Sequence, residues 1–451
     1  MSASKPRARP GAIPKFIPYP EYKDSGVEWL GDVPAKWEAK RLKSCLQRLD
    51  SGGTPESGNL EYWTDDESGT PWVAISDMTR SYELWNTAKR LTQEGLRSKH
   101  LPVLPAGTLL YSMYASLGKV ALLKIGAVVN QAILGLVTRD ELLIRDYLRW
   151  WLEFMQGHVL MLSSSNTQDN LNAEKVRTMP VFVPGSREQR AIAAFLDRET
   201  ARIDALVAKK ERLIELLQEQ RAAIITQVVT KGLDPEAPTT DSGSEWLEEI
   251  PAHWKVLRTD AFLIYEKDQV EPSTILDDLV FHYSIPSVQT NGDGALEPPT
   301  DIESAKLRIL GERLLVSKLN PRKGVVLIAS EKEVPTLCSS EFVPLKANGC
   351  DLRWALYLFS SETTRQRLSA VVRSATRSHQ RAEIAEIVKM WHGVPPVPEQ
   401  RAIAAFLDEE SSRIDDLITR VRVAIERLHE LRIALIAAAV TGKIDVRAEA
   451  A

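Results

Sequence analysis

The sequence predicts a mixed α and β (α+β) fold, in which two globular domains are joined by two long helices that pair as a coiled coil. Two observations predict it. A ten-residue segment occurs twice, and each copy opens a long stretch with apolar residues at helical spacing. The segments between these stretches carry short apolar runs bounded by turn residues, which are typical of strands. The length of 451 residues also exceeds that of one ordinary core.

The repeated segment reads EQRAIAAFLD at residues 188–197 and again, 211 residues later, at residues 399–408. A second repeated block lies upstream, where Glu-Trp-Leu, Pro-Ala and Trp within residues 28–37 recur within residues 245–254, displaced by 217. The chain is therefore two copies of one unit, related by an internal pseudo-two-fold repeat. Most differences between the copies lie inside the globular segments.

Local signals mark the ends of both long helices. Ser186 with Gln189 forms a plausible capping box, and Pro398 lies where the first turn of the second helix begins. Gly232 and Gly442 lie just past the two ends. A helix that runs from Glu188 to Thr230 spans about 60 Å. A single such segment would more often be an ordinary surface helix, but two matched copies favour pairing with each other.

Apolar residues alternate by three and four along both helices, which predicts a coiled-coil seam. If the helices run in opposite directions, Ile203 should lie near Leu435 or Ala438. The predicted seam comprises Ile203, Leu206, Leu213, Leu217 and Ile224 in the first helix, and Ile414, Leu417, Val421, Leu428, Leu431 and Leu435 in the second.

The globular segments combine predicted strands with helices. In the first segment we expect strands over residues 72–76, 108–113, 119–125 and 131–137, and a helix over 145–155. In the second we expect a strand over 325–329 and a helix over 354–360. The resulting division is a basic, proline-rich tail (1–20), a first domain (21–183), the first helix with a linker (184–237), a second domain (238–394) and the second helix (395–447).

Composition excludes several classes of protein. The net charge of −4 and the pI of about 6.1 argue against a protein that coats nucleic acid through bulk positive charge. Three cysteines without a CxxC pair suggest neither a disulfide framework nor a zinc site. Residues 1–20 lack the apolar region of a signal peptide, and no apolar run is long enough for a spanning helix. We therefore expect a soluble, cytoplasmic protein.

Motifs for catalysis are missing from the sequence. It contains no GxxxxGK[ST] phosphate loop, no GxGxxG after a strand, and no HExxH or GxSxG. Asn320-Pro321 continues with Arg322 rather than with the proline and aromatic residue of an adenine-methylating pocket. We expect no catalytic residue, no metal ligand and no cofactor on this chain.

Two local segments carry residues suited to DNA contacts. Residues 365–381 contain five arginines and His379 without an acidic residue, a composition that neutralises phosphates and can contact guanine. Residues 163–172 are rich in Asn and Gln, which suit adenine edges. A solvated helix face and a polar loop are the ordinary alternatives. The candidate contacts in these segments are Asn166, Thr167, Gln168, Arg373, Arg377, His379, Gln380 and Arg381.

Over nearly its whole length the chain resembles the specificity subunits of type I restriction-modification systems. The resemblance rests on the order and spacing of several short motifs, each weak alone. They are GVEWLGDVPAKW (26–37), Gly-Gly-Thr-Pro (52–55), Glu-Tyr-Trp (61–63), Pro-Trp-Val (71–73), Leu-Gly-Lys (117–119), Asn-Gln-Ala (130–132) and the repeated EQRAIAAFLD.

This resemblance implies two target-recognition domains separated by two long antiparallel coiled-coil helices, each domain binding one half of a bipartite asymmetric site in double-stranded DNA. It also implies two modification (methyltransferase) subunits and restriction (endonuclease/translocase) subunits as partners. S-adenosylmethionine, ATP and magnesium would be held by those partners. Polar residues at strand ends that match signature positions are further candidate DNA contacts: Thr54, Ser112, Lys119, Asn130 and Gln131. The second domain departs from the pattern, because it lacks the Gly-Gly-Thr-Pro and Asn-Gln-Ala signatures.

Two other classes of function stay open. A structural scaffold would use the two helices to hold two protein-binding domains, and would not bind DNA in a salt-dependent manner. A nuclease or methylase with an unrecognised site would cut or methylate DNA as the purified chain.

Overall fold

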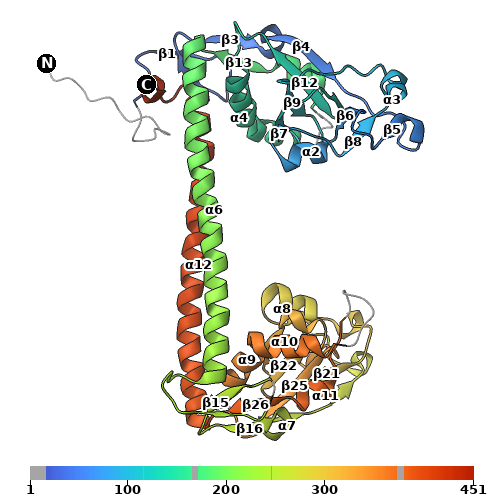
Figure 1. The fold of residues 1–451 in the computed structure, drawn as a ribbon, viewed down its shortest axis with the longest axis vertical. Coiled ribbons are helices and arrows are strands. Elements are labelled where there is room, and N and C mark those ends of the chain that lie inside the picture. The colour runs from blue at the N-terminus through green and yellow to red at the C-terminus, as the bar shows by residue number, and fades with distance from the viewer. Residues whose placement is uncertain (1–16, 115, 165–170, 245, 373–379, 451) are drawn as a thin grey trace, which may run out of the picture. The chain divides into compact units, whose positions relative to one another are not determined.

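The computed structural model describes residues 17–450, apart from 115, 165–170, 245 and 373–379. It divides into two compact units, unit 1 (Met1–Lys209 with Ala424–Ala451) and unit 2 (Lys210–Val423). Two long helices, α6 (Ser186–Lys231) and α12 (Val397–Val440), contribute to both units and are drawn in green and red in Figure 1. Each unit therefore combines one globular domain with part of each long helix.

The ends of the long helices follow the predicted glycine and proline signals. Pro398 lies in the first turn of α12. The N–H groups of a first turn have no acceptor within the helix, so a proline there costs no hydrogen bond. Gly232 and Gly442 adopt positive φ angles of 81° and 70° just past the two C-terminal ends, a conformation that favours glycine. The predicted capping box at Ser186 is wrong, because the Gln189 side chain is bonded to the globular domain instead.

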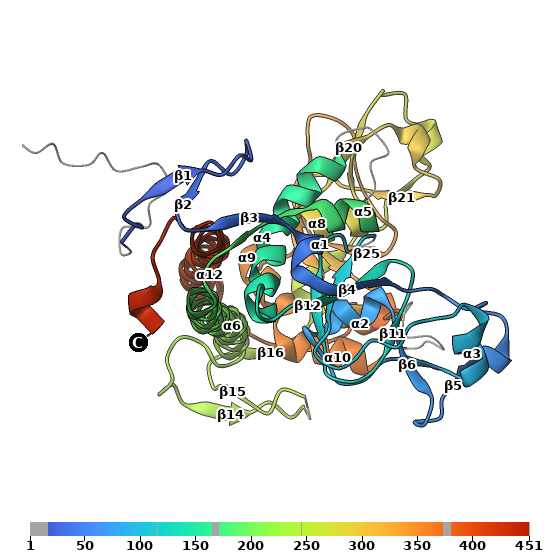
Figure 2. The same ribbon diagram turned by 90° about the horizontal axis from the view of Figure 1, so that it is seen from above.

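The two helices pair in opposite directions within each unit. In unit 1, Arg432 Nε donates to Asp204 Oδ1 at 3.2 Å, and Ile203 belongs to the same apolar core as Leu435 and Ala438. In unit 2, Arg221 donates to Asp415 Oδ1 at 2.8 Å. Figure 2 looks along both helices, which lie side by side. The antiparallel pairing is confirmed.

The buried stripe differs from the predicted seam at four of the eleven predicted positions. Leu206 and Leu213 are each 43% exposed, as is Leu431, and Leu417 is 40% exposed. Burial falls one residue later, at Val207, Ile214, Ile418 and Arg432. The predicted positions Ile203, Leu217, Ile224, Ile414, Val421, Leu428 and Leu435 are buried or half-buried. The stripe therefore steps by four and then three residues rather than by three and then four.

Two sheets form the globular part of unit 1. Most neighbouring strands are antiparallel, but β10–β7 and β11–β6 are parallel. The five-stranded sheet comprises, in order, β4 (Leu46–Ser51), β12 (Ile133–Thr138), β9 (Leu109–Ser112), β10 (Val120–Leu123) and β7 (Glu83–Leu84). The four-stranded sheet comprises β11 (Val128–Val129), β6 (Thr70–Val73), β8 (Lys89–Leu91) and β5 (Trp63–Thr64).

Four of these strands match predicted ones, although β6 ends at Val73 because α2 begins at Ile75. Two strand pairs complete the unit: β1 (Tyr22–Asp24) with β2 (Asp32–Pro34), and β3 (Glu38–Arg41) with β13 (Pro180–Val183). The remaining helical elements are α1 (Leu42–Cys45), η1 (Leu60–Tyr62), α2 (Ile75–Arg80), α3 (Gln93–Ser98), α4 (Arg145–Ser164), α5 (Ala173–Thr178) and η5 (Arg447–Ala450).

Helix α4 supplies the centre of the unit 1 core. Its Tyr147, Trp150 and Trp151 are almost fully buried, and they share one apolar core with β9, β12 and both long helices. The predicted helix over 145–155 is confirmed and continues further than expected.

Unit 2 also contains a four-stranded and a five-stranded sheet. The four-stranded sheet is antiparallel and comprises β17 (Leu263–Tyr265), β25 (Phe342–Ala347), β22 (Arg313–Ser317) and β23 (Val326–Ala329). The five-stranded sheet comprises β18 (Gln269–Val270), β21 (Lys306–Arg308), β24 (Thr336–Cys338), β19 (Val280–Tyr283) and β20 (Ala295–Glu297). Two strand pairs recur here as in unit 1: β14 (Thr239–Asp241) with β15 (Glu249–Pro251), and β16 (Lys255–Arg258) with β26 (Trp391–Val394).

The helices of unit 2 are shorter than α4. The helix predicted over 354–360 corresponds to α9, and the strand predicted over 325–329 corresponds to β23. The unit contains α7 (Thr259–Phe262), η2 (Pro272–Thr274), α8 (Ile285–Asn291), η3 (Pro299–Asp301), η4 (Pro321–Lys323), α9 (Leu352–Ser360), α10 (Glu362–Ala370) and α11 (Ile384–Val388). Strands and helices are mixed in both units, as the sequence predicts for an α+β fold.

Candidate nucleic-acid interface

The Gly-Gly-Thr-Pro loop of unit 1 crosses closely over the end of β11. A Cβ atom on Gly52 would lie 1.8 Å from the Val129 carbonyl oxygen, so only glycine fits there. The Gly53 N–H donates to that same carbonyl at 2.9 Å. This close approach brings Thr54 to Gln131, and the Thr54 hydroxyl donates to the Gln131 side-chain oxygen. Two motifs that are distant in the sequence thus share one surface.

Two tryptophans hold this loop in place. Trp72 Nε1 donates to the Gly53 carbonyl at 3.0 Å, and Trp63 Nε1 donates to the Glu56 carbonyl at 3.1 Å. The two rings meet edge to face with their centroids 5.1 Å apart. The motifs at residues 52–55, 61–63 and 71–73 are therefore parts of one structure.

Asn130 and Gln131 have different roles in this structure. Asn130 is half-buried and shapes the turn, because its Oδ1 accepts from the Ala132 N–H at 3.0 Å. The Asn130 N–H donates to the Val73 carbonyl at 3.1 Å. Gln131 is exposed and keeps its side-chain amide at the surface beside Thr54. Of these two candidates, Gln131 is the more exposed.

Ser112 does not lie on an exposed loop, contrary to expectation. It is the last residue of β9 and is fully buried, because its hydroxyl bridges the turn that follows. The hydroxyl oxygen accepts from the Lys119 N–H at 3.0 Å, and the hydroxyl donates to the Ser116 carbonyl. Lys119, at the other end of this turn, is half-buried. Ser112 thus supports Lys119 rather than contacting solvent.

Six candidates lie outside the residues that the structure describes. They are Asn166, Thr167 and Gln168 in unit 1, and Arg373, Arg377 and His379 in unit 2.

The two described candidates of unit 2, Gln380 and Arg381, lie beside the loop before η4. Asn320 N donates to the Gln380 carbonyl at 2.7 Å, and Arg381 forms an isolated β-bridge with Leu319. The Arg381 guanidinium binds both Glu341 carboxylate oxygens at 3.0–3.2 Å, which raises its pKa. Half of the Arg381 side chain stays exposed.

This loop adds two basic residues that lie outside the arginine-rich segment 365–381. Arg322 and Lys323 are exposed in η4, which packs against α10. A Cβ atom on Gly324 would lie 3.1 Å from Arg365 Cδ, so this arginine adjoins the loop. The sequence signal for Arg322 and Lys323 was the turn Asn-Pro-Arg-Lys-Gly at 320–324, which contains both of them. We call Arg322, Lys323, Arg365 and Arg381 the basic edge.

The repeated decapeptide attaches each globular domain to its long helix by the same bonds. The first glutamate accepts from an indole in both units, with Trp37 Nε1 donating to Glu188 and Trp254 Nε1 donating to Glu399, each at 3.0 Å. The glutamine that follows accepts from the N–H before a domain helix, from Ile144 to Gln189 at 2.7 Å in unit 1. Its counterpart Gln400 accepts from Asp351 N at 2.8 Å.

The last residue of the decapeptide completes these attachment contacts. Asp197 accepts from Trp150 Nε1 at 3.1 Å, and Asp408 accepts from the Tyr357 hydroxyl at 2.8 Å. Burial raises the pKa of Asp197, although Arg149 lies 3.0 Å away and opposes the shift. The identical decapeptides are therefore explained by one mode of attachment, used twice.

The described part of the chain offers no evident site for metal chemistry. Within residues 17–450 and outside the gaps, no group of three or more His, Cys, Asp or Glu side chains could hold a metal ion. No helix among the described residues is long and apolar enough to cross a membrane.

Comparisons with known proteins agree with each other. The family profile of the type I restriction modification DNA specificity domain matches residues 34–216. The type I restriction enzyme MjaIX specificity subunit of Methanocaldococcus jannaschii is 24% identical over 266 residues, which cover 57% of this chain and 58% of that protein. The type I restriction enzyme EcoDI specificity subunit of Escherichia coli is 20% identical over 331 residues, covering 68% of this chain and 72% of that protein.

Solved structures share the fold at low sequence identity. A chain from work on complex assembly and conformational transition of the type I R-M system has a TM-score of 0.68 at 14% identity. The alignment covers 91% of this chain and 99% of that one. The HsdS subunit from Thermoanaerobacter tengcongensis has a TM-score of 0.53 at 15% identity, covering 91% of this chain and 98% of that subunit.

Proposed function

The chain belongs to the specificity-subunit family of type I restriction-modification systems, and on that premise we propose that it selects the DNA sequence for such a complex. Each globular domain binds one half of a bipartite asymmetric site in double-stranded DNA. The chain itself performs no catalysis. It directs methyltransferase and endonuclease subunits to the site.

One observation carries the proposal. The attachment contacts Trp37–Glu188 and Trp254–Glu399 are the same in both units, whereas the surfaces beyond them differ. Unit 1 presents the Thr54–Gln131 surface, and unit 2 presents the basic edge. Two different binding surfaces on one repeated attachment suit recognition of two different half-sites.

The chemistry of the two surfaces supports different contacts with DNA. The Gln131 amide can donate and accept at an adenine edge, and Thr54 lies beside it for polar contacts, while Lys119, next to the Ser112 turn, suits a phosphate contact. We extend this surface to Asn166, Thr167 and Gln168. In unit 2, Gln380 and Arg381 continue from Arg373, Arg377 and His379, and arginine suits both guanine and phosphate. Asn130 and Ser112 shape the first surface from beneath it.

The long helices have a second task in this proposal. They set the distance between the two half-sites and bind two modification subunits, and restriction subunits join to complete the nuclease. S-adenosylmethionine, ATP and magnesium are held by those partners. The chain acts in the cytoplasm, where the DNA is.

Mapping methylated adenines in the source genome tests this function directly. With the chain present, methylation should occur at one split motif with a fixed unread gap. Deletion of the chain should abolish methylation at that motif, and re-expression should restore it. A methylation pattern that does not depend on the chain would contradict the proposal and would favour a scaffold.

A further inference from the structure

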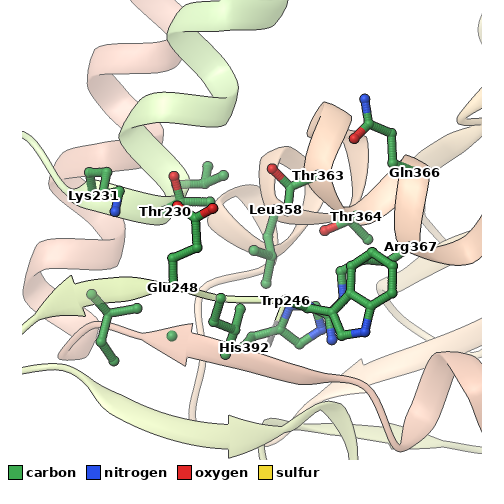
Figure 3. A pocket seen from close by; sticks show the side chains of 14 residues that line it. Thr230, Lys231, Trp246, Glu248, Leu358, Thr363, Thr364, Gln366, Arg367 and His392 are labelled. Atoms are coloured by element: carbon green, nitrogen blue, oxygen red, sulfur yellow. The ribbon is translucent and has the colours of Figure 1, made fainter. Parts of the chain in front are cut away.

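Unit 2 contains a cavity of about 310 Å³ that the proposed DNA-recognition function does not use. It lies between the C-terminal end of α6, the segment that leads into β15, helices α9 and α10, and strand β26. Figure 3 shows Trp246, Arg367 and His392 at one end of this cavity, and Thr230 with Lys231 at the other. The volume is at the lower end of the range for ligand pockets.

The internal repeat shows which residues of unit 1 correspond to the lining of this cavity. Trp150 and Tyr357 hold equivalent aspartates, so the next residues, Trp151 and Leu358, occupy equivalent positions. The repeat likewise matches Phe182 with Gly393. Unit 1 therefore has large rings where unit 2 has a leucine and a glycine.

Aromatic side chains fill the equivalent place in unit 1. The rings of Trp151 and Phe182 pack with centroids 5.8 Å apart, and Phe154 lies 5.6 Å from Trp151. Trp29, the counterpart of Trp246, stacks on His158 at 4.0 Å. In unit 2 Trp246 is 53% exposed and lines the cavity. The cavity thus lies beside Leu358, where unit 1 carries the Trp151 ring, whereas the space at Gly393 is already occupied by Ile250 and Trp254, each 3.1 Å from where a Cβ would lie.

A buried positive charge faces this space. Arg367 is only 8% exposed, and the described residues give it one acceptor, the Trp391 carbonyl at 2.7 Å, and no carboxylate. Burial lowers its pKa, with no acidic neighbour to oppose the shift. A buried guanidinium without a counter-ion is costly, and a bound anion would relieve that cost.

The other charged groups of the lining fix the charge of a ligand. Lys231 adds one positive charge, with its Nζ donating to the Glu249 carbonyl at 2.7 Å, and Glu248 adds one negative charge. His392 is fully buried with a pKa lowered to about 3, so it is neutral near pH 7. The lining therefore carries a single net positive charge, which suits a monoanion better than a phosphate dianion.

We propose that this cavity binds a small aromatic carboxylate, with its ring against Trp246 and its carboxylate on the Arg367 guanidinium. The ring replaces the aromatic packing that unit 1 supplies from its own residues. The carboxylate supplies the missing counter-ion and can accept two N–H bonds from one guanidinium.

Calorimetric titration of the full-length chain with indole-3-acetate tests the site. Indole supplies the ring alone, acetate the anion alone, and adenosine monophosphate a phosphate dianion. We expect indole-3-acetate to bind more tightly than all three. Acetate that binds equally well would mean an adventitious anion only, and tighter binding of adenosine monophosphate would overturn the choice of a carboxylate.

Matched variants locate the binding. Trp246→Ala and Arg367→Gln should each weaken indole-3-acetate at least about tenfold. Two control variants should leave binding unchanged. Trp85→Ala removes an exposed tryptophan of unit 1, and Arg365→Gln removes the other arginine of α10, the helix that carries Arg367. Equal binding to all four variants would place the ligand elsewhere and would overturn the proposal.

A fifth variant provides a test that does not require Arg367→Gln to fold. Leu358→Trp places the unit 1 residue in the cavity and should abolish binding while the helical circular dichroism stays unchanged. In the unaltered chain, indole-3-acetate should raise the melting temperature, and in Leu358→Trp it should not. A ligand-dependent rise that persists in this variant would contradict the site. None of these readouts involves DNA, so they do not depend on the proposed function.

Discussion

Arg432, toward the C-terminal end of α12, donates to Asp204, in the first half of α6, at 3.2 Å. Arg221 and Asp415 repeat this contact with the roles of the two helices exchanged, at 2.8 Å. Arg432 also binds Glu153 of α4 at 2.7 Å, so it joins the helix pair to the domain of unit 1. An arginine and an aspartate thus pair the two helices once in each unit. The two pairs occupy equivalent positions of the pseudo-two-fold repeat.

The register of the helix pair can be tested with two adjacent residues of α12. Ile418 is buried and Leu417 is 40% exposed, so Ile418→Ala should lower the free energy of unfolding by about 2–5 kcal/mol. Leu417→Ala should lower it by less than about 1 kcal/mol. Urea unfolding followed by helical circular dichroism measures both values. A larger loss for Leu417→Ala would restore the register that the sequence predicts.

Removing the indole donor from an attachment contact should destabilise the protein. Trp37→Phe leaves the Glu188 carboxylate without the Nε1–H bond, which should lower the free energy of unfolding by about 1–3 kcal/mol. Trp85→Phe is the matched control, because its indole donates to Glu83 at the surface. The control should lose less than about 0.5 kcal/mol. Similar losses for both variants would mean that the Trp37–Glu188 bond contributes no more to the free energy of unfolding than a surface bond.

The basic edge should affect how DNA binding by the assembled complex depends on salt. Lys323→Gln and Arg381→Gln should each lower the slope of log Kobs against log salt by about 0.9 if each side chain meets one phosphate. Arg401→Gln, at an exposed position of α12, is the charge-matched control. Unchanged slopes in both variants would exclude these side chains as phosphate contacts.

Gln131 should determine one base of the half-site bound by unit 1. Gln131→Ala should cost about 1–3 kcal/mol at one position and relax the base preference there. Glu56→Ala alters an exposed residue of the neighbouring Gly-Gly-Thr-Pro loop and should leave that preference unchanged. Sequencing of selected DNA fragments reports the preference. A uniform loss across all positions would assign Gln131 to phosphate or structure instead.

Lengthening both long helices should widen the unread gap between the half-sites. Four residues inserted after Lys210 and after Ile425 add about 6 Å to each helix, which is slightly more than one turn. Mapping of methylated adenines should find both half-sites unchanged and farther apart. Altered bases in either half-site, or a continuous motif, would refute the spacer mechanism.

The sequence predicted the helices and their pairing better than it predicted their register. The decapeptide and the glycines mark the helix bounds locally, so they needed no tertiary information. Leu206 and Val207 are both apolar, and only the partner helix decides which of them is buried. Similarly, Gln189 fits a capping box by spacing, but its amide is bonded to Ile144, 45 residues earlier in the chain.

The candidate DNA surface was predicted in part for a similar reason. Polar residues at strand ends can face solvent or serve the turn itself. Gln131 does the first, whereas the Ser112 hydroxyl closes the turn to Lys119 and is buried. The basic residues Arg322 and Lys323 were passed over because the arginines of their cluster come from separate parts of the chain, which only the fold brings together.

The core of unit 1 has a consequence for synthesis on the ribosome. Leu435, Ile436 and Val440 of α12, with Ile444 and Val446 beyond it, are buried in the same core as Trp151 and Phe182. The Tyr22 hydroxyl donates to the Gly442 carbonyl at 3.0 Å. The core of unit 1 is therefore complete only after residues 435–446 have been translated. Until then the apolar surface of unit 1 stays exposed to chaperones and proteases, while unit 2 is being synthesised.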